Sequence, residues 1–314
     1  MNPTLWHRLT NLLHSALLIG GMAAIVWACV SAIWGAESAL WAFLAVGLLL
    51  LMTPSLPSDL VLTLYRARPI RPQDFPEGAA ILQTLAGRAN LERMPGFFYL
   101  PSSVPNAFAT GHGSGTAIAI SDGLLRLLDK RELAAVLAHE VSHIAHRDLW
   151  IMALADVMAR VTSVASYVGQ ILLILNLPSL LTNSLHIPWH VPLLLAFSPT
   201  LMSLLQLALS RAREYDADLG AARLTGDPAA LASALAKLDN GSGKFWEEIL
   251  LPGRRIPEPS LLRTHPKTED RIRRLRTQFP EAFRQPRPSM FTPLAPGWPR
   301  VVARPRWRRT GVWY

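Results

Sequence analysis

Residues 136–148 read VLAHEVSHIAHRD, a largely apolar stretch with two histidines four residues apart and a glutamate directly after the first. In a helix, residues four apart lie about 40° apart around the axis and about 6 Å apart along it, so His139 and His143 project from one face. Two imidazoles on one face can bind one metal ion. Glu140 is rotated by about 100° from His139, which suits contact with a water on that metal. The stretch therefore predicts a metal centre with a base beside it.

The residues around this stretch predict how its helix is placed. Asp129 is the expected N-cap, Glu132 is the capping-box partner three residues later, and apolar residues follow at helical spacing. Charged residues lie at both ends, and a helix buried in lipid would hold such charges only at a cost. We therefore expect the histidines beside a membrane and not within it. His146 lies about 10 Å along the axis from His139, too far to share one zinc ion, so we expect it at the surface or against a ligand.

The composition indicates a membrane protein. Of 314 residues, 50% are hydrophobic and only 17% are charged, which is unusual for a soluble domain. Four apolar segments are long enough to cross a bilayer of about 30 Å, at residues 12–34, 39–56, 161–181 and 190–209. A cleavable signal peptide is the alternative for the first segment, and a buried helical pair is the alternative for the last two.

The distribution of basic residues predicts an orientation. The formal net charge is +9, yet the linkers at 35–38 and 182–189 contain no Lys or Arg. The positive-inside tendency therefore places both termini and the middle region in the cytoplasm, and it explains the basic surplus without nucleic acid as a partner. The single cysteine, Cys29, allows no intramolecular disulfide and no cysteine metal cluster. A metal site must then use His, Asp and Glu.

The polar middle region predicts a small α+β domain. A helical pattern covers residues 79–89, a strand is expected at 97–100, and residues 101–121 are expected to form two extended pieces joined by a glycine-rich loop. The loop reads GHGSG at 111–115 and lacks the Lys and Ser/Thr of a phosphate-binding loop. We therefore expect a hairpin turn there and no nucleotide site.

A third metal ligand is expected in residues 210–227, SRAREYDADLGAARLTGD. Glu214 and Asp218 are four apart on a predicted helix, where like charges repel unless a cation lies beside them. A zinc ion, together with the outer N–H of a zinc-bound histidine, would relieve the repulsion. We therefore predict Glu214 as the third ligand and Asp218 as the carboxylate that orients a ligand histidine. The alternative is a solvated ion-pair network with arginines from the same segment, Arg211, Arg213 or Arg223.

Four motifs occur in a distinctive order: PNAFATG, AHEVSH with RD following, REYDAD after a hydrophobic hairpin, and THPKTEDRI. Together they resemble the HtpX-like membrane zinc metalloproteases, a family related to the CAAX prenyl endopeptidases, over residues 5–280. The resemblance implies a zincin-type endopeptidase of the bacterial inner membrane that acts on membrane or misfolded proteins in quality control and the stress response. It implies one zinc ion held by His139, His143 and Glu214, with Glu140 as the catalytic base.

The resemblance also implies residues that touch the substrate. Asn106, Ala107 and Phe108 match a segment thought to form the edge strand that pairs with the substrate backbone. His265, in THP, matches a histidine that helps to hold the tetrahedral intermediate. The sequence departs from the family pattern in GHGSG and in the tail beyond Pro280, which bears on the detail of the substrate cleft.

The predicted fold is a mostly α membrane protein with four transmembrane helices and a cytoplasmic α+β zincin-type metalloprotease domain that contains a short edge-strand hairpin. We expect five segments: a transmembrane hairpin, the part with the HExxH helix, a second hairpin, the part with the third ligand, and a basic tail expected to be disordered. They cover residues 1–56, 57–160, 161–209, 210–280 and 281–314.

Three other functions fit parts of the sequence. A site-2-type intramembrane protease also uses HExxH, but it expects the motif inside a span. A prenyl-protein endopeptidase normally has more than four spans. A zinc-dependent membrane scaffold would bind metal without turnover. The expected partners are protein or peptide substrates and the lipid bilayer, to which the Arg- and Trp-rich tail adds either headgroup contacts or an inert solvated segment.

Overall fold

The computed structural model describes residues 3–37, 40–41, 44, 58–111, 115–177, 188–243 and 267–284. Backbone contacts divide the chain into two units. The long-helix unit comprises Met1–Ser55 and Trp150–Arg213, and the sheet unit comprises Leu56–Leu149 and Glu214–Tyr314. The described residues are mostly helical with one small mixed sheet, as the sequence predicts.

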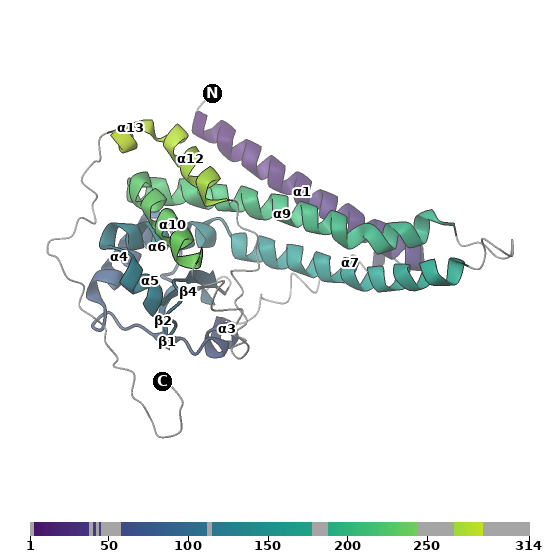
Figure 1. Ribbon diagram of the computed structural model, residues 1–314, viewed down its shortest axis with the longest axis horizontal. Coiled ribbons are helices and arrows are strands. Elements are labelled where there is room, and N and C mark those ends of the chain that lie inside the picture. The colour runs from purple at the N-terminus through teal and green to yellow at the C-terminus, as the bar shows by residue number, and fades with distance from the viewer. Residues whose placement is uncertain are drawn as a thin grey trace, which may run out of the picture. The chain divides into compact units, whose positions relative to one another are not determined.

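Three helices in the described residues are long and apolar enough to cross a membrane, namely α1 (Pro3–Trp34), α7 (Asp148–Asn176) and α9 (His190–Thr225). In Figure 1 their apolar parts run side by side. They agree with three of the four expected spans. The remaining expected span, residues 39–56, lies largely outside the described residues.

The long-helix unit is held together by apolar side chains from all three helices. Met22 and Val26 of α1 pack with Met152 of α7 and with Met202 and Leu209 of α9. Where α7 meets α9 the backbones approach closely, since a Cβ at position 169 would lie 2.6 Å from the Ala196 nitrogen. A glycine at such a crossing is typical of helices that associate in lipid.

The sheet has the strand order β1-β2-β4-β3, which makes β3 an edge strand. Its strands are β1 (Arg68–Pro69), β2 (Gly96–Leu100), β3 (Ala107–Thr110) and β4 (Ala117–Ser121). β2 runs parallel to β4, and the other pairs are antiparallel. The expected strand at 97–100 and the two extended pieces within 101–121 are therefore confirmed, whereas residues 112–114 of the expected glycine-rich loop lie outside the described residues.

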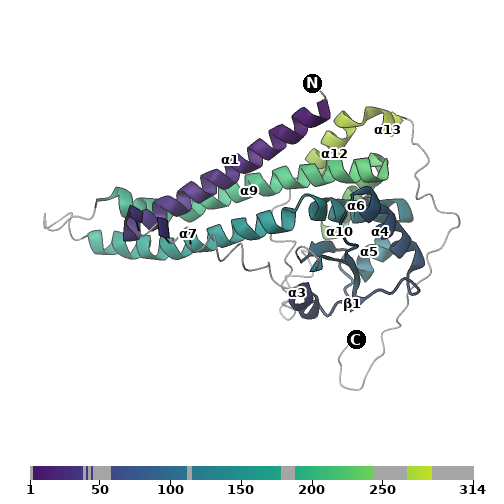
Figure 2. The same ribbon diagram turned by 180° about the vertical axis from the view of Figure 1, so that it is seen from behind.

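The central strand β4 is buried on both faces. Because side chains alternate along a strand, Ile118 and Ile120 face the main core of the sheet unit, whereas Ala117 and Ala119 pack with Leu62 of α3 on the other face. Figure 2 shows α3, which covers Ser58–Leu64, on the side of the sheet away from α4 and α6. The sheet is thus a layer between α3 on one face and helices that include α4 and α6 on the other.

Helix α6 (Lys130–Ala145) carries the histidine pair, and its predicted start is confirmed. The Asp129 side chain accepts from the Glu132 backbone N–H, and the Glu132 side chain accepts from that of Asp129, so the capping box is complete. Glu132 also accepts from Ser233 and Lys237, which ties the start of α6 to α10. The remaining helices of the sheet unit are α4 (Pro76–Arg88), α5 (Asp122–Leu127), α10 (Pro228–Gly243), α12 (Thr268–Gln278) and α13 (Pro280–Arg284).

Candidate metal centre

Helix α6 brings the two predicted histidines to one point. The Nε2 atoms of His139 and His143 lie 3.1 Å apart, and the ring planes are perpendicular. His139 is buried and His143 is half-buried, so the rings face an enclosed position within the sheet unit. The spacing of four residues on one helix therefore brings the two rings together, as the sequence predicts.

Helix α9 brings the two predicted carboxylates to the same place. Glu214 and Asp218 are both buried, at 7% and 3% exposed. Close to them the helices touch, because a Cβ at Gly220 would lie 2.0 Å from Ser142 Oγ of α6. Any larger residue at 220 would push α9 away from α6. The glycine therefore permits the approach that puts these carboxylates beside the rings.

The spacing of the donor atoms fits a tetrahedral ion. Bonds of about 2 Å to a tetrahedral zinc hold neighbouring ligand atoms about 3.3 Å apart. Glu214 Oε2 lies 3.4 Å from His139 Nε2, and Glu214 Oε1 lies 3.8 Å from His143 Nε2. One donor atom from each of the three residues can be chosen so that all lie within 4.8 Å of one another. The three predicted ligands therefore suit zinc with little movement.

The outer nitrogen of each ring faces a carboxylate. Asp218 Oδ1 lies 3.1 Å from His139 Nδ1, as the sequence predicts, and Asp148 Oδ2 lies 2.9 Å from His143 Nδ1. An ionised carboxylate can only accept, so each Nδ1 is expected to carry a proton and each Nε2 a lone pair. Two lone pairs 3.1 Å apart repel unless a cation or a proton lies between them. The arrangement therefore favours metal binding.

The charges around the centre point to a divalent cation. Glu214, Asp218, Asp148 and Glu140 contribute four negative charges when all are ionised, and Arg271 offsets one of them, so a divalent ion would offset most of the remaining negative charge. Without a metal, burial alone would lower the pKa of His139, but hydrogen bonds to Asp218 and Glu214 raise it to about 10. A proton then takes the place of the metal as the compensating positive charge.

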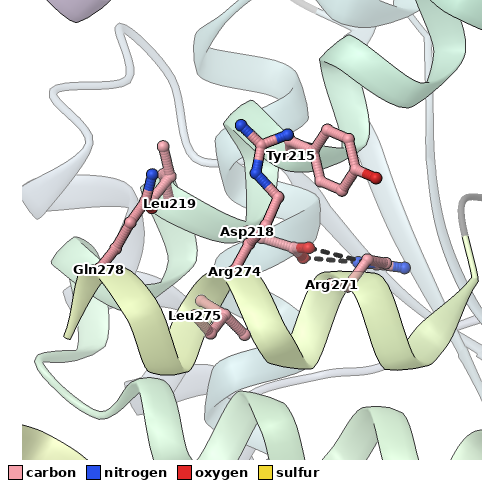
Figure 3. Close-up of a pocket in the computed structure, with 7 residues that line it drawn as sticks. All are labelled: Tyr215, Asp218, Leu219, Arg271, Arg274, Leu275 and Gln278. Atoms are coloured by element: carbon pink, nitrogen blue, oxygen red, sulfur yellow. Dashed lines mark hydrogen bonds and ion pairs between the residues drawn. The ribbon is translucent and has the colours of Figure 1, made fainter. Parts of the chain in front are cut away.

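Arg271 is the main residue of this centre that the sequence did not reveal. Figure 3 shows its side chain reaching from α12 to Asp218 of α9. Its Nε lies 2.8 Å and its Nη2 2.5 Å from the two Asp218 oxygens, and its Nη1 lies 3.2 Å from Glu214 Oε2. The predicted alternative partners of these acids were arginines of α9 itself. The only signal for Arg271 was its place in THPKTEDRI, which does not say what it contacts.

Glu140, the predicted base, interacts electrostatically with His139, His143 and Glu214. It is 9% exposed and receives a hydrogen bond from the backbone of Ala109 in the edge strand β3. Burial raises the pKa of its carboxyl above the usual range, although His139 and His143 lower it. A carboxylate with a raised pKa is a better proton acceptor near neutral pH.

The remaining predicted residues are the three at the edge strand, His265 and His146. Asn106 directly precedes β3, and Ala107 and Phe108 open it, so all three lie at the edge strand. His265 lies outside the described residues. His146 is exposed at the C-cap of α6 and contacts Ser142, which matches the expected surface position.

The comparisons with known proteins agree with this geometry. A family model described as "Peptidase family M48" matches residues 72–278, which is more than half of the chain. The chain belongs to peptidase family M48. The matched region contains His139, Glu140, His143, Glu214 and Arg271. As an M48 peptidase with long apolar helices, the chain is a membrane-bound metalloprotease.

Similar proteins carry a consistent name. A relative from Acaryochloris marina named "Protease HtpX homolog" is 39% identical over 228 residues, which cover 69% of this M48 chain and 77% of the relative. A protein of the same name from Pyrococcus abyssi is 37% identical over 237 residues, which cover 69% of this chain and 78% of the relative. A third, from Methylibium petroleiphilum, is 32% identical over 288 residues, which cover 86% of this chain and 99% of the relative. The resemblance inferred from the motifs is therefore confirmed.

Proposed function

We propose that the chain is a zinc-dependent endopeptidase of the bacterial inner membrane that cleaves membrane or misfolded proteins at the cytoplasmic face, in membrane protein quality control. The observation that carries the proposal is the convergence of His139, His143 and Glu214 beside Glu140 in an M48 chain. The lack of Lys and Arg in both hairpin linkers supports the cytoplasmic placement of the site.

The mechanism follows from the side chains around the ligands. His139, His143 and Glu214 would hold zinc, which when bound lowers the pKa of a water to about 7 and polarises a peptide carbonyl. Glu140 accepts the proton of the attacking water and later delivers it to the leaving amine. Arg271 keeps Glu214 and Asp218 in place throughout. We retain His265 as the proposed donor to the developing oxyanion.

The register of the edge strand suggests which backbone groups would bind the substrate. Ser121 N–H donates to the Asn106 carbonyl at 2.9 Å, so in this antiparallel pair the backbone groups of Asn106 and Phe108 face β4. The alternate residues, Ala107 and Ala109, then point their backbone groups outward from the sheet. Ala109 donates to Glu140, which supports this assignment. We therefore propose that an extended substrate pairs with Ala107 and with the Ala109 carbonyl.

Metal removal tests the proposed function directly. We expect the full-length protein, purified in detergent, to cleave unfolded casein, to lose this activity after dialysis against a zinc chelator, and to regain it when zinc is added. Bound zinc, measured by elemental analysis, should fall and return in parallel, near one ion per chain. Because protons compete for the two rings, the metal should bind more weakly as pH falls. Cleavage that survives complete zinc removal would contradict the proposal.

Replacing Ala107 with proline tests the substrate strand. The substitution removes an outward N–H and leaves the hydrogen bonds between β3 and β4 intact, a position where edge strands tolerate proline. We expect kcat/KM for an unfolded protein substrate to fall about tenfold, the value of one lost hydrogen bond of roughly 1.4 kcal/mol. Ala107→Ser keeps the N–H and should behave like the unchanged protein. Equal activity of the two variants would rule out pairing at Ala107.

A further inference from the structure

We propose that Asp148 is a positioning residue of the metal centre, whose carboxylate fixes the His143 ring in the tautomer that turns Nε2 toward His139 and Glu214. The HExxH pattern does not include this residue, which lies three positions beyond the last residue of the helix that carries the pattern. The proposal rests on the metal centre proposed above. It adds a carboxylate that orients the His143 ring, as Asp218 orients the His139 ring.

The contact is direct and enclosed. Asp148 Oδ2 lies 2.9 Å from His143 Nδ1, and Asp148 is only 2% exposed. A carboxylate at this place selects the ring form with the proton on Nδ1, because it can accept a hydrogen bond but cannot donate one. Nε2 is then left unprotonated, which is the state that a metal requires.

The turn between α6 and α7 places Asp148 for this contact. α6 ends at Ala145, His146 is its C-cap, and Arg147 has a left-handed φ of 57°. That conformation costs a residue other than glycine roughly 1 to 2 kcal/mol. It interrupts the helical path between α6 and α7, and Asp148 at the start of α7 contacts His143, five residues earlier. Backbone strain of this kind often accompanies a functional contact.

The start of α7 supports the role of the carboxylate as an acceptor. Asp148 is the first residue of that helix, where the backbone N–H groups have no partner within the helix and attract negative side chains. His139 has an equivalent contact to Asp218 of α9. The two rings are thus oriented by carboxylates from two different helices, and the loss of either should free one ring.

Zinc affinity of the full-length protein tests the proposal. Competition with a fluorescent chelator should show that Asp148→Ala raises the zinc dissociation constant about 10-fold to 100-fold, the usual effect of losing such a partner. Asp148→Asn keeps an oxygen that accepts from Nδ1 and should cause a smaller rise. Asp122→Asn is the matched control, since it removes an acid from the first turn of α5 without touching a histidine. It should leave the dissociation constant unchanged.

A purely structural role would give a different result. It would lower the thermal stability of Asp148→Ala while leaving its zinc dissociation constant within twofold of the unchanged protein, and that outcome would overturn the proposal. If Asp148→Ala does not fold, ¹⁵N spectra of histidine-labelled, zinc-loaded protein decide: both ligand rings should carry the proton on Nδ1. A ligand ring protonated on Nε2 would contradict it. If the unchanged protein binds no zinc, the proposed function itself is wrong.

Discussion

Glu140→Gln is expected to abolish proteolysis while leaving zinc bound. The glutamine side chain has almost the same size and can still receive the hydrogen bond from Ala109, but it cannot accept a proton from water. General acid and base catalysis contributes about 10²-fold to 10⁴-fold, so kcat should fall by at least about that factor. The ligands His139, His143 and Glu214 are untouched. Casein cleavage and zinc content, measured on the same preparation, check both parts of the prediction.

The control for this variant is an exposed glutamate of the same unit. Glu92→Gln removes the same charge from the surface and should leave turnover unchanged. If Glu140→Gln keeps zinc and still cleaves casein at the original rate, Glu140 is not the base. If it loses zinc as well, Glu140 contributes to metal binding, contrary to its proposed role as a base alone.

Local sequence patterns predicted the parts of the site that lie within single elements. The capping box at Asp129 and Glu132 set the start of α6, and the four-residue spacing set the relation of His139 to His143. The same spacing placed Glu214 on the face of α9 that carries Asp218. In each case helical periodicity determines which side chains share a face, so a single stretch is sufficient.

Contacts between distant elements were not predictable in the same way. Asp148 follows a left-handed residue, Arg147, and no helical spacing relates it to His143. Arg271 lies 53 residues after Asp218, on a helix whose packing the sequence does not specify. The repulsion between Glu214 and Asp218 indicated that a cation was needed. It could not indicate that a guanidinium would be present in addition to a metal.

Arg271→Ala is expected to destabilise the sheet unit strongly. Removing one partner of a buried ion pair typically costs about 3 to 5 kcal/mol, because the remaining charge stays buried without compensation. Here Asp218 would lose both of its charged hydrogen bonds from Arg271, and Glu214 would lose a contact at 3.2 Å. Chemical unfolding in detergent micelles should therefore show a free energy of unfolding lower by about 3 kcal/mol or more.

Helix α12 supplies its own control for this prediction. Arg273 pairs with Asp270 at 2.6 Å, but its side chain is 74% exposed, and exposed pairs contribute only about 0 to 1 kcal/mol. Arg273→Ala should therefore change stability little. Arg271→Lys keeps the charge but cannot bind both Asp218 oxygens through a planar fork, so it should fall between the two alanine variants. Adding Asp218→Asn to Arg271→Ala should recover part of the loss, because it removes the uncompensated buried charge. Equal stabilities for Arg271→Ala and Arg273→Ala would mean that the guanidinium does not hold the carboxylates of the centre in place.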